Sequence, residues 1–540
     1  MSSSQRAERA SFRPVDRLRA NGIGLLGIMF LLIGATSPLL AILGNVPIEI
    51  SAGNGVYAPG GYVLWIVGLL LFAVGYAAMA KRMVSTGGFY SYISHGLGRP
   101  AGLVAGWSAL AAYAIGEAGL LGGLGYFAAN TFATELGLHI SWVIYVAVAL
   151  AIITALSYRD VRLSTKVLGV LGVVEVLVLL VVDLVVTARG GAHGLTLAPL
   201  NPAKAFTGAS PTVGLMFAFL SWVGFEMIPN YAEETSNPKR NVSRGLYLGV
   251  LALGVLYILS SWAGIMGNGV GSSVALATKN PVDFYFTIAS RFVGSWAATS
   301  MEWLIVSSTF AACLVWHQTT ARYFYVLGRE GVVAPLGRTH RRHASPHVAV
   351  LFQAAVVVFW VAAFLVFYAL DKAARSYAGN FATAPYAELF AWLLVATTLF
   401  ILVNEFLCSI AVLRYFRSEE KRNLADWGRF VVAPAAATLL LGVMLIVAVT
   451  HVGTLGGDIG FVNMIPIICA VWVVIGLALA LWLRARHPAV YARLGALVEQ
   501  LGAGSAELQS TKDTAAAEPA TTGRGVLEGE MAPSPEAGLA

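Results

Sequence analysis

Charged residues are scarce in this chain of 540 residues: Asp, Glu, Lys and Arg make up 12% of it, whereas hydrophobic residues make up 58%. A soluble domain of average composition carries about 25% charged residues, so this composition excludes an ordinary soluble protein. Cysteine is also rare, and its three residues, Cys313, Cys408 and Cys469, all fall inside hydrophobic stretches. A framework of extracellular disulfides is therefore not expected.

Several catalytic and targeting patterns are missing as well. The chain has no His-Glu-x-x-His spacing and no nucleotide-binding glycine loop, so we predict no metal, no cofactor and no enzyme activity. Residues 1–20 are polar and rich in Arg and show no cleavable signal pattern. The densest group of histidines is predicted to be solvated at a cytoplasmic helix end; its members are His317, His340, His343 and His347.

Long hydrophobic runs dominate the rest of the chain. A helix needs roughly 20 apolar residues to cross the hydrocarbon core of a bilayer. Runs of that kind predict an all-α integral membrane protein with about twelve transmembrane helices. The predicted spans are 22–44, 61–80, 101–131, 141–157, 167–187, 211–231, 245–268, 294–320, 348–369, 386–413, 430–450 and 463–483.

The distribution of positive charge predicts the orientation of these helices. If the N-terminus is cytoplasmic, 29 of the 35 Lys and Arg residues fall on the cytoplasmic side. Short cytoplasmic loops carry the excess of Lys and Arg, so we expect both termini in the cytoplasm and a location in the cell membrane. The net charge of +7 then reflects orientation, and no nucleic-acid partner is predicted.

Two of the predicted helices are interrupted at corresponding places. The first carries Gly34-Ala35-Thr36-Ser37-Pro38 and the sixth carries Ser221-Trp222-Val223-Gly224-Phe225-Glu226. Irregular backbone at membrane depth is tolerated only where it is buried in protein or lines a polar cavity. A single break of this kind is more often a kink, but a matched pair points to the substrate site of a transporter built from inverted repeats.

Further motifs lie between the helices, in loops predicted to be cytoplasmic. They are Ser85-Thr86-Gly87-Gly88-Phe89-Tyr90, Glu233-Glu234-Thr235-Ser236-Asn237-Pro238 and Arg322-Tyr323-Phe324-Tyr325-Val326-Leu327-Gly328-Arg329-Glu330-Gly331. Together with Gly224-Phe225-Glu226, they make residues 22–414 resemble the amino acid, polyamine and organocation family of secondary transporters. We interpret the Gly-Gly loop and the Arg-Glu-Gly turn as structural elements whose salt links shift during gating.

The resemblance implies a core of two inverted five-helix repeats, with discontinuous helices 1 and 6, over residues 21–415. Helices 11 and 12, within 416–487, would be peripheral, residues 1–20 a cytoplasmic segment and residues 488–540 a disordered cytoplasmic tail. The implied activity is alternating-access transport of an amino acid or amine as the small-molecule partner, within the lipid bilayer. The oligomeric state is left open.

The resemblance also places a substrate site at the two breaks. Free N–H groups at a helix break attract an anion and free carbonyls attract a cation, and an amino acid zwitterion offers one of each. The first break would hold the carboxylate, and carbonyls of the sixth helix the amine. An aromatic lid over the substrate is a further hypothesis, strongest for Trp222. The implied substrate residues are Gly34, Ala35, Thr36, Ser37, Phe219, Ser221, Trp222 and Gly224.

Five acids lie within the hydrophobic runs: Glu117, Glu175, Glu226, Glu302 and Glu405. A charged carboxylate at the bilayer centre costs about 2.5–3.5 kcal/mol, so each should face the bundle interior. Coupling and gating roles are predicted for Glu117, Glu175, Phe225 and Glu226. The alternative for each acid is a purely structural bond to a neighbouring helix.

Ser307 and Ser308 in the eighth helix are a candidate sodium site, because hard cations prefer oxygen ligands. Serine pairs also hold membrane helices together, which is the favoured interpretation. Helix 5 has no central lysine that could replace sodium. Proton symport is preferred, with sodium symport and exchange as alternatives. A nutrient-sensing receptor on the same fold is the alternative outside transport.

Overall fold

The computed structural model describes residues 18, 22–159, 161–419, 423–452 and 460–495. Almost all of the predicted segment 1–20 and of the tail from residue 496 therefore lie outside the described residues. Within the described ranges the chain is helical, and its one β-contact is an isolated parallel bridge between Ile23 and Thr235.

Among the described residues, fourteen helical elements lie in the first half of the chain, through the sixth predicted span. They are α2 (Leu25–Thr36), α3 (Pro38–Leu40), η2 (Ala41–Asn45), α4 (Val46–Ala52), η3 (Gly55–Tyr57), α5 (Ala58–Arg82), α6 (Phe89–Leu97), α7 (Arg99–Leu136), α8 (Trp142–Tyr158), α9 (Val161–Ala188), η4 (Ala198–Leu200), η5 (Pro202–Phe206), α10 (Pro211–Leu220) and η6 (Phe225–Glu234).

The second half continues with fifteen. They are α11 (Pro238–Asn268), α12 (Ser273–Lys279), α13 (Asp283–Phe292), α14 (Ser295–Arg329), η7 (Ala334–Gly337), α15 (His347–Leu370), α16 (Lys372–Ala378), η8 (Pro385–Phe390), α17 (Ala391–Tyr415), η9 (Phe416–Ser418), α18 (Leu424–Trp427), η10 (Gly428–Val432), α19 (Ala433–His451), α20 (Gly460–Arg486) and α21 (Pro488–Arg493).

Eleven of the described helices are long and apolar enough to cross a membrane, and each overlaps one predicted span. The remaining predicted span corresponds to α8, an apolar helix of 17 residues. Seventeen residues lie at the lower end of the length range of transmembrane helices. The chain is thus an all-helical, multi-pass membrane protein.

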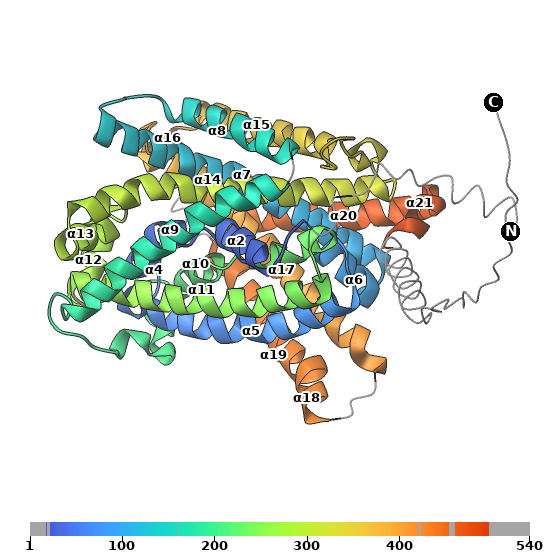
Figure 1. Cartoon of the computed structure of the whole chain (residues 1–540), viewed down its shortest axis with the longest axis horizontal. Coiled ribbons are helices and arrows are strands. Elements are labelled where there is room, and N and C mark those ends of the chain that lie inside the picture. The colour runs from blue at the N-terminus through green and yellow to red at the C-terminus, as the bar shows by residue number, and fades with distance from the viewer. Residues whose placement is uncertain (1–17, 19–21, 160, 420–422, 453–459, 496–540) are drawn as a thin grey trace, which may run out of the picture. The chain divides into compact units, whose positions relative to one another are not determined.

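The helices that carry the two breaks lie inside the bundle. The first is flanked by α9, α11 and α14, and α5 runs alongside α11 (Figure 1). In the most apolar stretch of the span that begins at Leu25, 67% of the residues are buried. In that of the span that begins at Pro211, 83% are buried. By contrast, the spans of α19 and α20 are only 28% and 22% buried. This difference places α19 and α20 at the outside of the described bundle.

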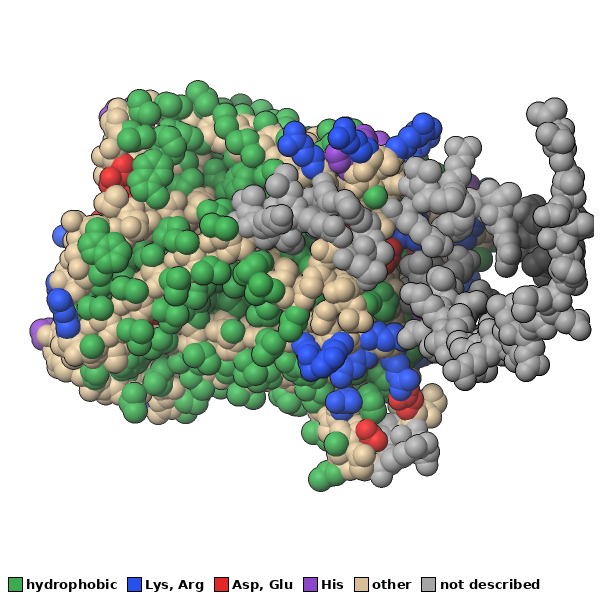
Figure 2. All heavy atoms as spheres, viewed as in Figure 1, with side chains coloured by type: hydrophobic (Ala, Val, Ile, Leu, Met, Phe, Trp, Pro, Cys, Tyr) green, Lys and Arg blue, Asp and Glu red, His purple; other side chains and the backbone are tan. Residues whose placement is uncertain are grey.

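Hydrophobic side chains cover most of the face shown in Figure 2, and Lys and Arg side chains gather in the half that contains α6. An apolar belt of this kind matches the hydrocarbon region of a bilayer. The first residues of the segment from 488, predicted to be disordered, form a short helix, α21. Leu494, the residue that follows α21 in the chain, is 1% exposed.

Candidate functional site

The first break lies at Ser37. This residue ends α2 with a φ of 46°, in the left-handed region that residues other than glycine rarely adopt. The next residue, Pro38, has no N–H and starts α3. The carbonyl of Gly34 therefore loses the donor that a continuous helix would supply. The neighbouring carbonyl, that of Ala35, accepts a hydrogen bond of 2.8 Å from the indole of Trp316.

The second break follows Leu220, where α10 gives way to a turn and then to η6. Gly224 has a φ of 124°, a conformation that only glycine adopts easily. A Cβ on Gly224 would lie 2.8 Å from the carbonyl carbon and oxygen of Ala35. The two breaks are therefore in direct backbone contact, and the absence of a side chain at Gly224 allows it.

Glu226 holds the second break in place. Its Oε2 accepts the N–H of Gly224 at 2.8 Å, and its Oε1 accepts the hydroxyl of Tyr113 at 3.0 Å. Tyr76 donates to the Glu226 carbonyl at 2.9 Å. The carboxylate thus satisfies an N–H that the broken helix leaves without a backbone partner and ties the break to α7.

A small cavity lies where the breaks meet. It has a volume of about 30 Å³, enough for one or two water molecules. Its polar lining comes from three residues on the first broken helix, Thr36, Ser37 and Asn45. The other lining residues are Ala35, Leu40, Ala41, Leu120, Leu220, Val223, Ala312, Trp316, Phe390 and Leu394. No charged side chain lines it.

Of the predicted substrate residues, Ala35, Thr36 and Ser37 line this cavity, whereas the other five do not. Gly34 faces Leu168 and Val315. The carbonyls of Phe219, Ser221 and Gly224 each already accept one hydrogen bond, from Trp222 N, the Tyr257 hydroxyl and Met227 N respectively. A carbonyl oxygen has two lone pairs, so each retains capacity for an ammonium group.

Two predicted aromatic residues of the second break pack away from the cavity. Trp222 is fully buried, with ring centroids 5.6 Å from Tyr62 and 5.2 Å from Tyr257. Phe225 meets Phe72 edge to face at 6.0 Å. In this conformation the aromatic side chain at the cavity that contacts the first break is Trp316, which sequence reasoning did not single out.

A chain of hydrogen bonds leads away from the cavity through residues that sequence reasoning also missed. Asn45 donates to Ser221 Oγ at 3.0 Å, and the Tyr62 hydroxyl lies 3.0 Å from the same oxygen. Tyr62 in turn donates to Glu49 at 2.6 Å. Glu49 is fully buried. Glu49 follows Asn45 by one helical turn, and this spacing could have pointed to it. The predicted first span ends at residue 44, so Glu49 was not considered among the intramembrane acids.

The two serines of the candidate cation site make different contacts. Ser308 Oγ lies 2.6 Å from Ser37 Oγ at the first break, whereas Ser307 donates to the carbonyl of Leu304 on its own helix. The carboxyl of Glu175, on α9, lies near the Ser308 hydroxyl and is 2% exposed. The structure therefore joins an acid of the fifth span, a hydroxyl of the eighth and the first break.

Two further intramembrane acids, Glu117 and Asp183, lie in separate clusters. Glu117 accepts hydrogen bonds from Gln353 at 2.8 Å and lies 2.7 Å from Nδ1 of His317. His317 is fully buried, so the prediction that it is solvated is wrong: it lies well before the end of α14. Asp183 on α9 is a buried acid that sequence reasoning overlooked; it accepts the hydroxyls of Ser260 and Tyr285.

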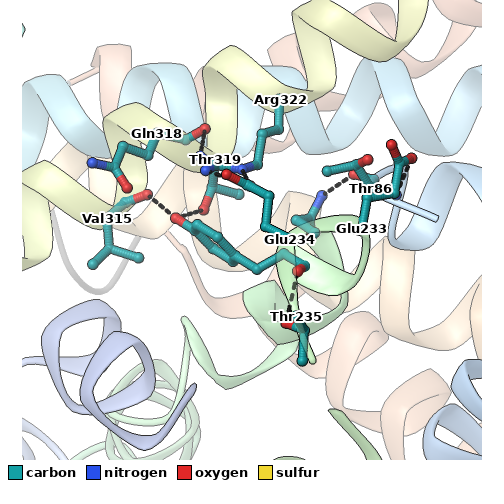
Figure 3. Close-up of polar contacts among 10 residues, drawn as sticks. Thr86, Glu233, Glu234, Thr235, Val315, Gln318, Thr319 and Arg322 are labelled. Atoms are coloured by element: carbon teal, nitrogen blue, oxygen red, sulfur yellow. Dashed lines mark hydrogen bonds and ion pairs between the residues drawn. The ribbon is translucent and has the colours of Figure 1, made fainter. Parts of the chain in front are cut away.

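Another polar cluster, built around an ion pair, lies between the two breaks and the loops predicted to be cytoplasmic. Figure 3 shows Arg322 of α14 pointing at Glu234 at the end of η6, and their charged atoms are 2.6 Å apart. The guanidinium also lies 4.1 Å from the ring centroid of Tyr231 and donates to the Gln318 carbonyl. Both charged side chains are about 5% exposed. We call these residues the Arg322 gate.

The sequence motifs converge beside this gate. Arg329 forms an ion pair of 3.1 Å with Glu233, which also accepts the N–H of Thr86 at 3.1 Å. Asn230 donates to the Thr86 carbonyl at 3.0 Å. The start of the first broken helix is tied to the same place, because Gly22 N donates to the Glu234 carbonyl at 2.7 Å. The salt links expected from the motifs are therefore present.

The end of the described chain also packs near these motifs. Gly495 N donates to Glu330 at 2.9 Å and to the Tyr90 hydroxyl at 3.0 Å, and Tyr90 itself donates to Glu330. Arg99 donates to the Leu494 carbonyl at 3.1 Å. Burial raises the pKa of Glu330 to about 7, so this contact contains a carboxyl that titrates near neutral pH.

Comparison with solved structures agrees with this architecture. Two mutant forms of a manganese transporter from Eremococcus coleocola superpose with TM-scores of 0.51 and 0.52 at 11% identity, covering 87% of this chain and 95% of theirs. At this identity the likeness concerns the fold alone. A helical membrane bundle with two broken helices in contact is the architecture that many membrane transport proteins share.

Within that class, the sequence belongs to the amino acid permease family, whose profile matches residues 23–477. Similar proteins include the branched-chain amino acid permease BcaP of Bacillus subtilis, 24% identical over 58% of this chain and 69% of that protein. BcaP of Lactococcus lactis is 27% identical over 63% and 75%. The low-affinity putrescine importer PlaP of Escherichia coli is 24% identical over 56% and 66%. These names point to transporters and not to enzymes.

The contact between the breaks yields a first prediction. We expect Gly224→Ala to reduce uptake at least tenfold, because its Cβ would clash with the Ala35 backbone in a strained φ region, whereas Gly34→Ala should retain most activity. The Cβ at position 34 would meet the flexible end of Leu168 at 2.9 Å, which can shift. Uptake per inserted molecule, quantified at equal membrane expression, tests the difference. Equal activity of the two variants would contradict it.

Proposed function

We propose that this permease moves an amino acid or a related amine across the cell membrane by alternating access, with the substrate at the contact between the two breaks. The observation that carries this proposal is the cavity lined by Thr36, Ser37 and Trp316 between two interrupted, buried helices. Interrupted helices expose N–H and carbonyl groups at membrane depth, which suits a zwitterion. The two inverted repeats and the cytoplasmic position of both termini are part of the proposal.

The closed Arg322 gate supports alternating access. A substrate in the cavity could reach the motif loops only if the contacts of Arg322, Glu234 and Tyr231 separated. The cavity is also far smaller than an amino acid, so substrate entry requires the bundle to expand. Both features fit a conformation in which the site is closed on the side of the motif loops.

The lining of the cavity favours a substrate with an apolar side chain. Leu40, Leu120, Leu220, Val223 and Leu394 contribute aliphatic groups, and no carboxylate faces the cavity to pair with a second ammonium. Burying an unpaired charge is costly. We therefore rank neutral aliphatic amino acids before putrescine, in line with the names of two relatives.

Coupling to protons is the preferred energy source. Protonation of Glu175 would change the charge beside Ser308 and, through Ser308, the contact to Ser37 at the break. Sodium bound by the same oxygens, and exchange without coupling, are the alternatives. A nutrient-sensing receptor would bind substrate without moving it.

Uptake by purified protein in proteoliposomes tests the proposal. We expect labelled leucine, isoleucine or valine to accumulate under an inward pH gradient, with Gly224→Ala proteoliposomes as the inactive control. Stabilisation of the protein by an amino acid without any uptake or exchange would favour the sensing receptor. Saturable uptake of putrescine but of no amino acid would contradict the ranking of substrates and leave the transporter assignment intact.

A further inference from the structure

A second and larger cavity lies away from the substrate cavity, between α15, the η8 to α17 helix and the start of α20. Its volume is about 160 Å³. It is lined by Trp360, Ala363, Phe364, Phe367, Glu388, Leu389, Trp392, Leu393 and Phe461. Five of these nine side chains are aromatic, and one is an acid. We call it the Glu388 cavity.

The aromatic walls form a partial cage. The rings of Phe367, Trp392 and Phe461 contact one another in all three pairs, with centroids 6.0, 5.5 and 6.0 Å apart. On α15, Trp360 and Phe364 continue the wall along the same helix face, because residues four apart lie above one another. Phe461 is 38% exposed, so the cage is open on the side of α20.

Glu388 has no bonding partner in the part of the chain that the structure describes. The residue is fully buried, and neither carboxyl oxygen accepts or donates a hydrogen bond. None of the ion pairs among the described residues includes it. The indole N–H of Trp392, in the same wall, also lacks a partner. A buried acid left unpaired is strongly unfavourable, and most buried polar groups are satisfied.

We propose that the Glu388 cavity binds an organic ammonium ion with apolar substituents, either a free amine or the headgroup of a membrane lipid. Aromatic faces attract cations, and cages of this kind recognise quaternary ammonium groups. The Glu388 carboxylate supplies the counter-charge, and the Trp392 indole can donate to an oxygen that the ligand carries. This site is separate from the substrate cavity, whose lining contains neither residue.

The same short helix connects the two cavities. Glu388 and Leu389 face the Glu388 cavity, whereas Phe390 lines the substrate cavity. All three belong to η8, a π-helical turn of the kind that occurs frequently at functional sites. The Tyr386 hydroxyl of η8 also lies 3.3 Å from the carbonyl of Gly44 in the first broken helix. A ligand held by Glu388 would therefore act on a segment that the substrate contacts.

Direct binding measurements on the purified full-length protein test the site. The probe is benzyltrimethylammonium, compared by calorimetry with neopentylbenzene, which has the same shape without the charge. We expect the cation to bind at least tenfold more tightly than the neutral compound, and Glu388→Gln to remove that preference. Glu405→Gln is the matched control, because Glu405 is another buried acid without a partner among the described residues, on the same helix.

A second variant keeps the test valid if Glu388→Gln fails to fold. Phe461→Leu removes one partly exposed wall of the cage and should weaken the cation several-fold without affecting the neutral compound. Equal binding of the two compounds, or an unchanged cation affinity in both variants, would overturn the proposal. Because binding is measured directly, this result does not depend on whether the protein transports amino acids.

Nanodiscs distinguish the two sources of the ligand. If a lipid headgroup occupies the cavity, benzyltrimethylammonium should bind more weakly in phosphatidylcholine discs than in discs of digalactosyldiacylglycerol, because choline competes with it and neither lipid has a net charge that would attract the probe. If a free amine is the natural ligand, the two affinities should agree. Both results support ammonium recognition at Glu388, provided that Glu388→Gln weakens the probe. Lipid-dependent binding that is unchanged in Glu388→Gln would place the probe elsewhere and overturn it.

Discussion

The Glu175→Gln variant is expected to lose proton-driven accumulation of substrate while it continues to exchange substrate across the membrane. A gradient of one pH unit, with one proton per substrate, can sustain accumulation of up to about tenfold. Glutamine keeps the size of the side chain and a hydrogen-bonding group for Ser308, but it cannot carry the proton. Accumulation should therefore fall to about onefold, whereas counterflow of labelled substrate should persist.

Neighbouring residues supply controls for this experiment. Glu117→Gln changes an acid that His317 and Gln353 already engage, in a cluster separate from the first break, so this variant should retain coupling. If sodium drives transport, Ser308→Ala should raise the sodium requirement sharply while Ser307→Ala, whose hydroxyl bonds its own helix, should not. Uptake that responds to neither gradient, but accelerates with substrate on the far side, would make this protein an exchanger.

Replacing Arg322 with Met should open the side of the protein that the Arg322 gate closes. Removal of one partner from a buried ion pair costs about 3–5 kcal/mol, which corresponds to a shift of roughly 100- to 5,000-fold in the equilibrium between closed and open forms. Glu234 would remain buried without its counter-charge. The measurement is the rate at which an impermeant maleimide modifies an Ala321→Cys reporter, since Ala321 is buried on the same helix. We expect a large acceleration and a strong loss of net uptake.

An exposed ion pair provides the matched control. Arg82 and Glu419 are 2.8 Å apart, but their side chains are 53% and 32% exposed. Pairs of this kind contribute only about 0–1 kcal/mol, so Arg82→Met should leave the reporter rate close to that of the parent. Adding Glu234→Gln to Arg322→Met should restore part of the closed population, because the unpaired charge is removed. An unchanged rate in Arg322→Met would contradict the gate.

Much of the architecture could be predicted from local properties of the chain. Pro38 removes a backbone donor wherever it occurs in a helix, and a turn through Gly224 needs a residue without a Cβ. Both breaks were therefore visible in the sequence. The residues that each break contacts could not be predicted in this way. The hydrophobic periodicity of a helix indicates which of its faces is apolar, but not which other helix that face packs against.

The functional side chains show the same limit more sharply. Ser307 and Ser308 are adjacent, and the sequence does not distinguish their roles. Successive side chains of an α-helix point about 100° apart, so only Ser308 faces Ser37. His317 was assigned to a solvated group because three histidines follow it in a loop, whereas α14 keeps it in the core beside Glu117.

The sequence by itself determined that this protein is a multi-pass helical bundle with two interrupted helices, since hydrophobic length and backbone chemistry are local properties. Only the tertiary structure decided which acids stand beside a break, beside a histidine or alone among aromatic rings. Glu175, Glu117 and Glu388 are all acids in apolar helices, and their surroundings depend on residues more than 100 positions away or on the packing of separate helices. Their chemistry follows from those neighbours, because the cost and the use of a buried charge depend on what it faces.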